Sequence, residues 1–150
     1  MRLSRFDELF QKLYSSWDDS HFVSDCYDVV DELKQMNQPV IAADYIFRLL
    51  EDLPDTDFGL PGPLIAYIEE ACEEEYETKL LASLNRKPVF YTIWMLNRLI
   101  NSYTGDAKLR LIGIMQRITE REELSTDLQE QAKGYVEFQM KRLNIEESRH

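Results

Sequence analysis

The chain has 150 residues, of which 44% are hydrophobic and 30% charged, and its 28 acidic and 17 basic residues give a formal net charge of −11. This length and composition predict one folded domain over residues 1–150 and exclude an intrinsically disordered chain. A charge this negative is repelled by phosphate backbones and anionic bilayers. We therefore expect a basic protein partner, with no nucleic acid and no membrane.

We expect neither a targeting signal nor reactive cysteines. No apolar stretch reaches the roughly 18 residues of a membrane span, and the first ten residues, MRLSRFDELF, are amphipathic and include Asp7 and Glu8 where a signal peptide is apolar. We expect a cytoplasmic protein. Cys26 and Cys72 lie in apolar helical patterns without a second thiol or a histidine at metal-binding spacing, which predicts two buried, reduced cysteines.

Apolar residues recur at spacings of three and four along nearly the whole chain, and no segment alternates as a strand does. The fold class is therefore all-α, with seven to eight helices in an irregular bundle or in a HEAT-like stack of antiparallel helix pairs. The expected helices cover residues 3–17, 22–36, 39–53, 63–77, 80–84, 89–103, 109–118 and 128–143.

Helix ends in the first half of the chain carry recognisable signals. Ser4 is a candidate cap for the first helix, and Asp18–Ser20 offers one for the second. Asn37 closes the second helix, and Pro39 suits the first turn of the third. Three prolines and two glycines in residues 51–63 cannot continue a helix, so this segment is expected to form a long loop.

The second half has its own end signals. Gly105 is expected to separate the sixth and seventh helices, and Thr126 with Gln129 matches a capping box for the last one. The residues after Leu143 are polar, so 144–150 are expected to fray as a tail. The helix over 89–103 is apolar nearly all round, which is typical of a central helix.

Acidic residues are concentrated in the first half of the sequence. Residues 1–77 hold 5 basic and 19 acidic residues, a net charge of −14, whereas residues 78–150 hold 12 and 9, a net charge of +3. On a continuous helix over 63–77, at about 100° per residue, five glutamates fall on one face. We call these the glutamate stripe: Glu69, Glu70, Glu73, Glu74 and Glu77.

The glutamate stripe is a candidate partner-binding surface. It contains like-charge pairs at four-residue spacing near the expected C-terminal end of a helix, where both repulsion and the helix dipole disfavour anions, so local stability does not explain it. Further candidate contacts lie in the second helix and the loop: Asp25, Asp28, Asp31, Glu32, Asp55 and Asp57. The alternative is a solvated surface, with Lys79 and Arg86 neutralising part of the stripe.

A second candidate lies in the expected central helix. Asn97 and Asn101 are one turn apart, and buried amides must find hydrogen-bond partners, so they indicate a structural network. Alternatively, Trp94 and Arg98 are anchors in an interface, because aromatic and arginine side chains dominate such contacts.

The sequence contains no recognisable catalytic or cofactor-binding motif. Its two histidines, His21 and His150, have no nucleophile motif beside them, and its five glycines form no phosphate-binding loop. The one Glu-x-x-His spacing, Glu147 to His150, has no second copy as a two-metal helical site requires, and no calcium-loop spacing occurs. We expect no enzyme activity, no metal and no cofactor. The competing enzyme hypothesis places an unfamiliar carboxylate site at Asp55, Asp57 and the glutamate stripe.

The centre of the chain resembles a known family. The segments FGLPGPLIAYIEE from Phe58 and LLASLNRKPVFYTIWMLNRLINS from Leu80 are similar to all-helical bacterial immunity proteins of contact-dependent growth inhibition and related polymorphic toxin systems. The similarity lies in the Leu60–Pro63 turn, the Arg86–Pro88 turn and the run Trp94–Arg98. The helices before Ser20 and after Glu120 show no resemblance.

The resemblance implies a protein that binds the C-terminal domain of a cognate toxin, one to one, and blocks it in the cytoplasm. Many such toxins are nucleases, which are basic because they hold phosphates, and an acidic protein can mask that surface. The alternative function is a helical adaptor or scaffold protein with a non-toxin protein partner. Composition alone does not distinguish the two.

Overall fold

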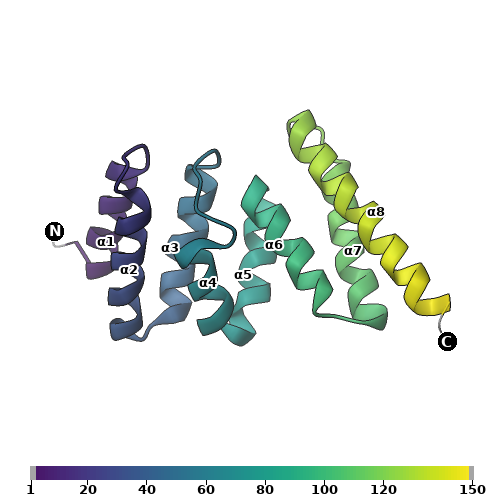
Figure 1. Cartoon of the computed structure of the whole chain (residues 1–150), viewed down its shortest axis with the longest axis horizontal. Helices are drawn as coiled ribbons and strands as arrows, with labels where there is room; N and C mark the ends of the chain where they lie inside the picture. The colour runs from purple at the N-terminus through teal and green to yellow at the C-terminus, as the bar shows by residue number, and fades with distance from the viewer. Residues whose placement is uncertain (1–2, 149–150) are drawn as a thin grey trace. The chain divides into compact units, whose positions relative to one another are not determined.

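The computed structural model describes residues 3–148, which form eight helices and no strand (Figure 1). The all-α prediction is confirmed. The helices are α1 (Arg5–Ser16), α2 (Phe22–Met36), α3 (Pro39–Asp52), α4 (Gly62–Ala71), α5 (Glu73–Arg86), α6 (Phe90–Asn101), α7 (Gly105–Thr119) and α8 (Thr126–Ser148).

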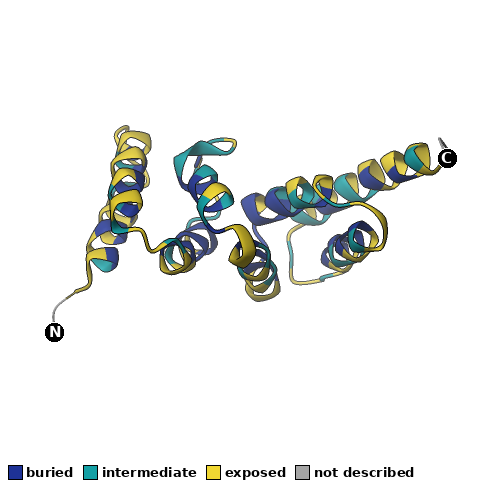
Figure 2. Ribbon diagram, turned by 90° about the horizontal axis from the view of Figure 1, so that it is seen from below, coloured by how far each residue is buried: buried dark blue, intermediate teal, exposed yellow. Residues whose placement is uncertain are grey.

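The chain divides into two compact units, Met1–Ser83 and Leu84–His150, with the boundary inside α5. Each unit is held together by packed helix pairs. The prediction of a single domain, and the choice between a bundle and a helix-pair stack, remain predictions. In both units buried and exposed residues alternate turn by turn along the ribbons, as amphipathic helices require (Figure 2).

In the first unit, α2 packs against α1 and α4, and α3 packs against the same two helices. α5 is joined to α3 by the ring contact of Tyr76 with Phe47 and by the ion pair between Lys79 and Asp44. The core consists of large side chains with at most 1% of their surface exposed, among them Leu13, Leu33, Ile46, Phe47, Leu49, Leu50, Leu64, Ile65 and Ile68. This apolar contact fixes which helix faces remain available to a partner.

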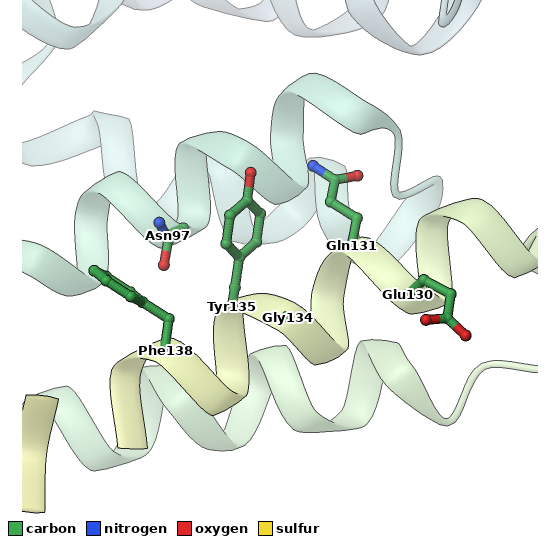
Figure 3. Close-up of a pocket in the computed structure, with 6 residues that line it drawn as sticks. All are labelled: Asn97, Glu130, Gln131, Gly134, Tyr135 and Phe138. Atoms are coloured by element: carbon green, nitrogen blue, oxygen red, sulfur yellow. The ribbon is translucent and has the colours of Figure 1, made fainter. Parts of the chain in front are cut away.

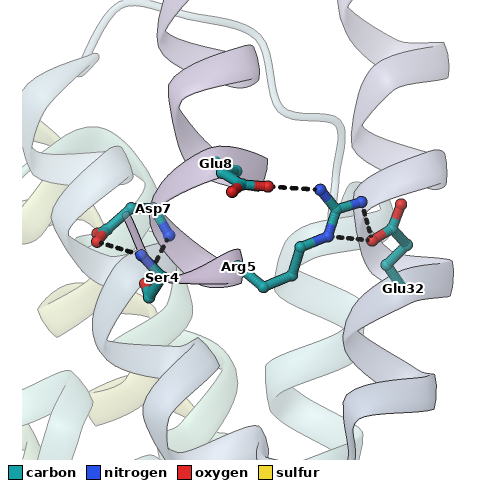
Figure 4. Close-up of polar contacts among 5 residues, drawn as sticks. All are labelled: Ser4, Arg5, Asp7, Glu8 and Glu32. Atoms are coloured by element: carbon teal, nitrogen blue, oxygen red, sulfur yellow. Dashed lines mark hydrogen bonds and ion pairs between the residues drawn. The ribbon is translucent and has the colours of Figure 1, made fainter. Parts of the chain in front are cut away.

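The start of α1 confirms the Ser4 cap and shows how it is made (Figure 4). The Ser4 Oγ accepts from the Asp7 N–H at 3.0 Å, and the Asp7 carboxylate accepts from the Ser4 N–H at 3.2 Å. Arg5, the next residue, donates to Glu8 on its own helix and to Glu32 on α2. The cap stabilises the first turn of α1, and Arg5 ties this turn to α2.

The helix signals that follow are confirmed in part. Asn37 closes α2 in the left-handed conformation, with φ 52°, and Pro39 begins α3, as expected. The cap expected at Asp18–Ser20 is wrong, because α2 begins after His21, which makes no side-chain cap. The Asp19 carboxylate instead accepts from the His21 N–H within the preceding turn, at 3.2 Å.

The expected loop at 51–63 is shorter at both ends. α3 continues through Glu51 to Asp52, because Pro54 is the first residue that interrupts the helix, and α4 begins at Gly62. The Glu51 carboxylate is 4% exposed and accepts from the Ser83 hydroxyl at 2.7 Å. Gly59 has φ +94°, and an added Cβ would lie 2.6 Å from the Gly62 Cα, so the turn requires glycine there.

In the second unit, α6, α7 and α8 contact one another pairwise. The Gln131 amide donates to the Phe90 carbonyl at the start of α6, and Gln139 donates to Asn97 and Asn101 further along, so α6 and α8 run in the same direction. Gly105 opens α7 with φ +61°, consistent with a break after α6.

Both ends of α8 differ from expectation. The Ser125 hydroxyl, not Thr126, accepts from the Leu128 N–H, so the capping box is wrong. The helix also continues to Ser148, which contradicts the predicted frayed tail over 144–148; Arg149 and His150 lie outside the described residues. The reason is an ion pair at 3.6 Å between Glu146 and Lys108 of α7, whose side chain is 3% exposed.

Candidate functional site

The glutamate stripe does not exist as a single helix face. α4 ends at Ala71, and α5 begins at Glu73, whose backbone has φ +31°. The continuous helix on which the five glutamates would share a face is therefore interrupted at Cys72. Glu69 and Glu70 belong to α4, whereas Glu73, Glu74 and Glu77 belong to α5. No proline or glycine marks this break, which is why periodicity missed it.

The break also changes the energetic argument for these residues. Glu73, Glu74 and Glu75 occupy the first turn of α5, where the helix dipole stabilises anions. The inference that local stability cannot explain this part of the stripe is therefore wrong. Glu73 and Glu74 have a structural role that needs no partner, and the functional argument moves to the acidic residues elsewhere in the first unit.

Two of the predicted acidic residues meet in a groove between α2 and α4. Asp31 and Glu70 are 39 positions apart in the sequence, yet both line the same hollow of about 360 Å³. We call it the acidic groove. Its lining residues are Tyr27, Val30, Asp31, Lys34, Pro61, Gly62, Pro63, Ala66, Tyr67 and Glu70.

The walls of the acidic groove combine carboxylates with aromatic surface. The Tyr27 side chain is 56% exposed beside the exposed Asp31, whereas Tyr67 is buried and its pKa is raised by that burial. Lys34 is the basic side chain among the lining residues. Carboxylates next to an exposed aromatic ring suit a guanidinium or ammonium group, which can form charge-assisted hydrogen bonds and stack on the ring.

The remaining acidic residues of α2 face α1 instead. Lys12 of α1 lies 3.7 Å from the Asp25 carboxylate and 3.9 Å from that of Asp28, and Arg5 binds Glu32. These ion pairs are largely exposed, so each contributes little to stability. These ion pairs nevertheless neutralise part of the negative charge of α2.

Asp55 and Asp57 lie in the loop before α4 and are exposed. The Asp57 carboxylate accepts from the Gly59 N–H at 2.9 Å, which stabilises the turn that leads into α4. The ammonium group of Lys79 binds Asp44 of α3 at 2.6 Å. The first unit holds 19 acidic and 6 basic residues, a net charge of −13, against 9 and 11, a net charge of +2, in the second.

The pair Trp94 and Arg98 lies in the second unit and is not part of the acidic groove. The Arg98 guanidinium lies 4.8 Å from the centre of the Trp94 ring, a cation–π contact. The structural alternative for Asn97 and Asn101 is confirmed, since both amide oxygens accept from the buried Gln139 at 2.8 Å. Gln139 itself was not singled out in the sequence, because its partners are about 40 positions away.

A second hollow lies between α6 and α8 and holds about 460 Å³ (Figure 3). We call it the α6–α8 groove. Its lining residues are Asn97, Glu130, Gln131, Gly134, Tyr135 and Phe138. Figure 3 shows Tyr135 and Phe138 rising from α8 toward α6, on either side of Asn97.

Within 3–148 no group of three or more histidine, cysteine, aspartate or glutamate side chains is placed to hold a metal. Cys26 and Cys72 are buried free thiols, as predicted. Burial raises the pKa of Cys26 to about 12 and also raises that of Cys72, so both thiols stay protonated and poorly nucleophilic.

Comparisons with protein families, characterised proteins and solved structures give no match. The resemblance to immunity proteins therefore stays a prediction. No helix in the described part of the chain combines the length and the apolar character needed to cross a membrane.

Proposed function

We propose that the chain is a non-catalytic binding protein whose first unit captures a basic protein. The observation that carries this proposal is the acidic groove, where Asp31 and Glu70 lie beside the exposed ring of Tyr27 on a unit with a net charge of −13. The negative electrostatic field of this unit accelerates the approach of a basic partner, and the acidic groove can bind an arginine or lysine of that partner.

Within this class we propose a toxin-neutralising immunity protein that masks the substrate surface of a basic nuclease domain in a one-to-one complex. The family resemblance of the central segments supports the class of partner, and the acidic groove supports the mode of binding. A helical adaptor with a non-toxin partner is the alternative. It gains support from the α6–α8 groove, since a second hollow in the other unit suits a protein that joins two partners.

The deciding experiment expresses the C-terminal region of the adjacent upstream reading frame in cells, with and without this protein. We expect toxicity that co-expression relieves, together with a complex that co-purifies. A toxic neighbour that this protein neither binds nor neutralises would contradict the immunity function. A harmless neighbour would favour the adaptor.

Charge reversal tests the role of the acidic groove in that complex. Because both side chains are exposed, Asp31→Lys with Glu70→Lys should leave the fold intact and slow association by about tenfold or more, with a weaker dependence on salt. Glu120→Lys with Glu137→Lys, exposed residues of the second unit, is the matched control. Equal association rates for the two double variants would remove the acidic groove from the interface.

A further inference from the structure

The α6–α8 groove has a helical glycine in its wall. Gly134 is exposed in the middle of α8, and a Cβ added there would meet no atom within 4 Å. Glycine inside a helix is less stable than alanine by about 1 kcal/mol. Neither a positive φ nor close packing requires it here. Its effect is to keep this side of the groove open.

A buried amide determines which polar atoms the groove presents. Gln139, fully buried, donates both of its amide hydrogens, one to the Asn97 Oδ1 and one to the Asn101 Oδ1, each at 2.8 Å. Asn97 lines the groove, and its amide nitrogen is a hydrogen-bond donor. The side chain of Gln131, which also lines the groove, has a buried amide oxygen without a hydrogen-bond partner among the described residues. The groove therefore presents a donor, the Asn97 amide nitrogen, and an acceptor, the Gln131 amide oxygen, as the backbone of a bound peptide requires.

Two arginines lie on the helices that form the groove, each placed over an aromatic ring. Arg98 follows Asn97 on α6 and lies over Trp94, while Arg142 is one turn beyond Phe138 on α8, with its guanidinium 5.5 Å from that ring. Arg142 therefore lies at the Phe138 end of the groove, and Arg98 extends back along α6 toward Trp94. Glu130 lines the opposite end.

We propose that the α6–α8 groove binds an acidic peptide segment of a partner protein, with an apolar side chain against Gly134 and Phe138 and a carboxylate toward Arg98 and Arg142. A carbonyl oxygen of the segment accepts from Asn97. Phe138 is 47% exposed, so the groove covers one side of its occupant. Small molecules are usually enclosed far more completely, whereas a partner protein brings further surface. This binding is independent of the acidic groove.

The test selects peptides from a display library of random sequences on the full-length protein. We expect enrichment of sequences that place an aspartate or glutamate next to an aliphatic or aromatic residue. Gly134→Leu, which fills the groove, and the double variant Arg98→Gln with Arg142→Gln should each weaken binding of a selected peptide about tenfold or more. Lys133→Leu, which adds the same side chain one position away, is the control, with folding checked by circular dichroism.

Three results would overturn the proposal. One is the absence of enriched acidic and apolar sequences. Another is a selected peptide that binds Gly134→Leu as tightly as it binds the unchanged protein. The third is tight binding of an oligothymidylate that needs Arg98 and Arg142, which would assign the groove to single-stranded nucleic acid, where aromatic rings stack on bases. Loss of toxin binding in the acidic-groove variants has no bearing on these outcomes.

Discussion

Asp7 connects the first turn of α1 to α3. Its carboxylate accepts from the Ser4 backbone and, at 2.8 Å, from the Tyr45 hydroxyl. The hydrogen bond from Tyr45, followed by those involving Ser4, lowers the pKa of Asp7 from its ordinary value. The folded protein therefore favours the ionised form of this side chain.

This preference predicts a specific acid sensitivity. Below the ordinary pKa of aspartate, near 4, the unfolded chain binds the Asp7 proton before the folded chain does, so stability falls as the pH falls through the lowered pKa. The free energies of unfolding of the unchanged protein and of Asp7→Asn should therefore differ at neutral pH and converge in acid. Urea unfolding at a series of pH values measures the difference.

Asp18→Asn, in the exposed turn after α1, is the control, and its free energy of unfolding should differ from that of the unchanged protein by the same small amount at every pH. A difference between Asp7→Asn and the unchanged protein that did not vary with pH would contradict the role assigned to this carboxylate.

The junction of α4 and α5 is the element with the largest departure from the sequence pattern. Glu73 has φ +31°, in the left-handed region that glycine tolerates best. The Cys72 thiol, just before it, donates to the Pro39 carbonyl at 3.2 Å and so ties the junction to the start of α3. The packing of two separate helices, and not a local helix breaker, sets this break.

A glycine substitution distinguishes a break from a continuous helix. At the observed junction, Glu73→Gly should leave the free energy of unfolding unchanged or raise it by up to about 1 kcal/mol. Inside the exposed part of α5, Ala82→Gly should lower it by about 1 kcal/mol. Chemical denaturation of both variants measures these changes, and an equal loss for the two would mean that α4 and α5 form one helix.

Local signals predicted the elements well and their spatial relations poorly. Ser4, Asn37 and Pro39 act on the backbone within a few residues of their own position. Their roles at helix ends can therefore be predicted from the local sequence. Asp31 and Glu70 come together because α2 and α4 pack, and nothing near either residue indicates the other. Asn97 and Asn101 indicated that a hydrogen-bond partner exists. The identity of that partner, Gln139, depends on how α6 and α8 are aligned, which the sequence near the asparagines does not indicate.

Over the whole molecule, the charge is divided unevenly. The first unit has a net charge of −13 and the second +2, so self-repulsion should weaken mainly the first. Each unit contains one tryptophan: Trp17, at the end of α1, and Trp94, in α6. Fluorescence can therefore report on each unit separately.

Salt should stabilise the first unit more than the second. Raising the ionic strength from about 0.01 M to about 0.15 M shortens the Debye length from about 30 Å to about 8 Å. A gain of about 1 kcal/mol in a unit of this size raises its Tm by about 4–8 °C. Thermal unfolding of Trp94→Phe, which reports through Trp17, should shift upward more than that of Trp17→Phe.

A transition reported by Trp17 that did not respond to salt would contradict this account of the charge. Transitions that coincide for both reporters at every salt concentration would show that the two units unfold as the single domain predicted from length.

The two buried thiols can report how often the first unit opens. A protonated, enclosed sulfur reacts with an alkylating reagent only after the surrounding helices open, so the labelling rate counts opening events. Cys26 lies on α2 and Cys72 at the junction before α5. Because the two thiols lie in different elements, the order in which they become labelled reveals which part of the first unit opens first, without any substitution in the chain.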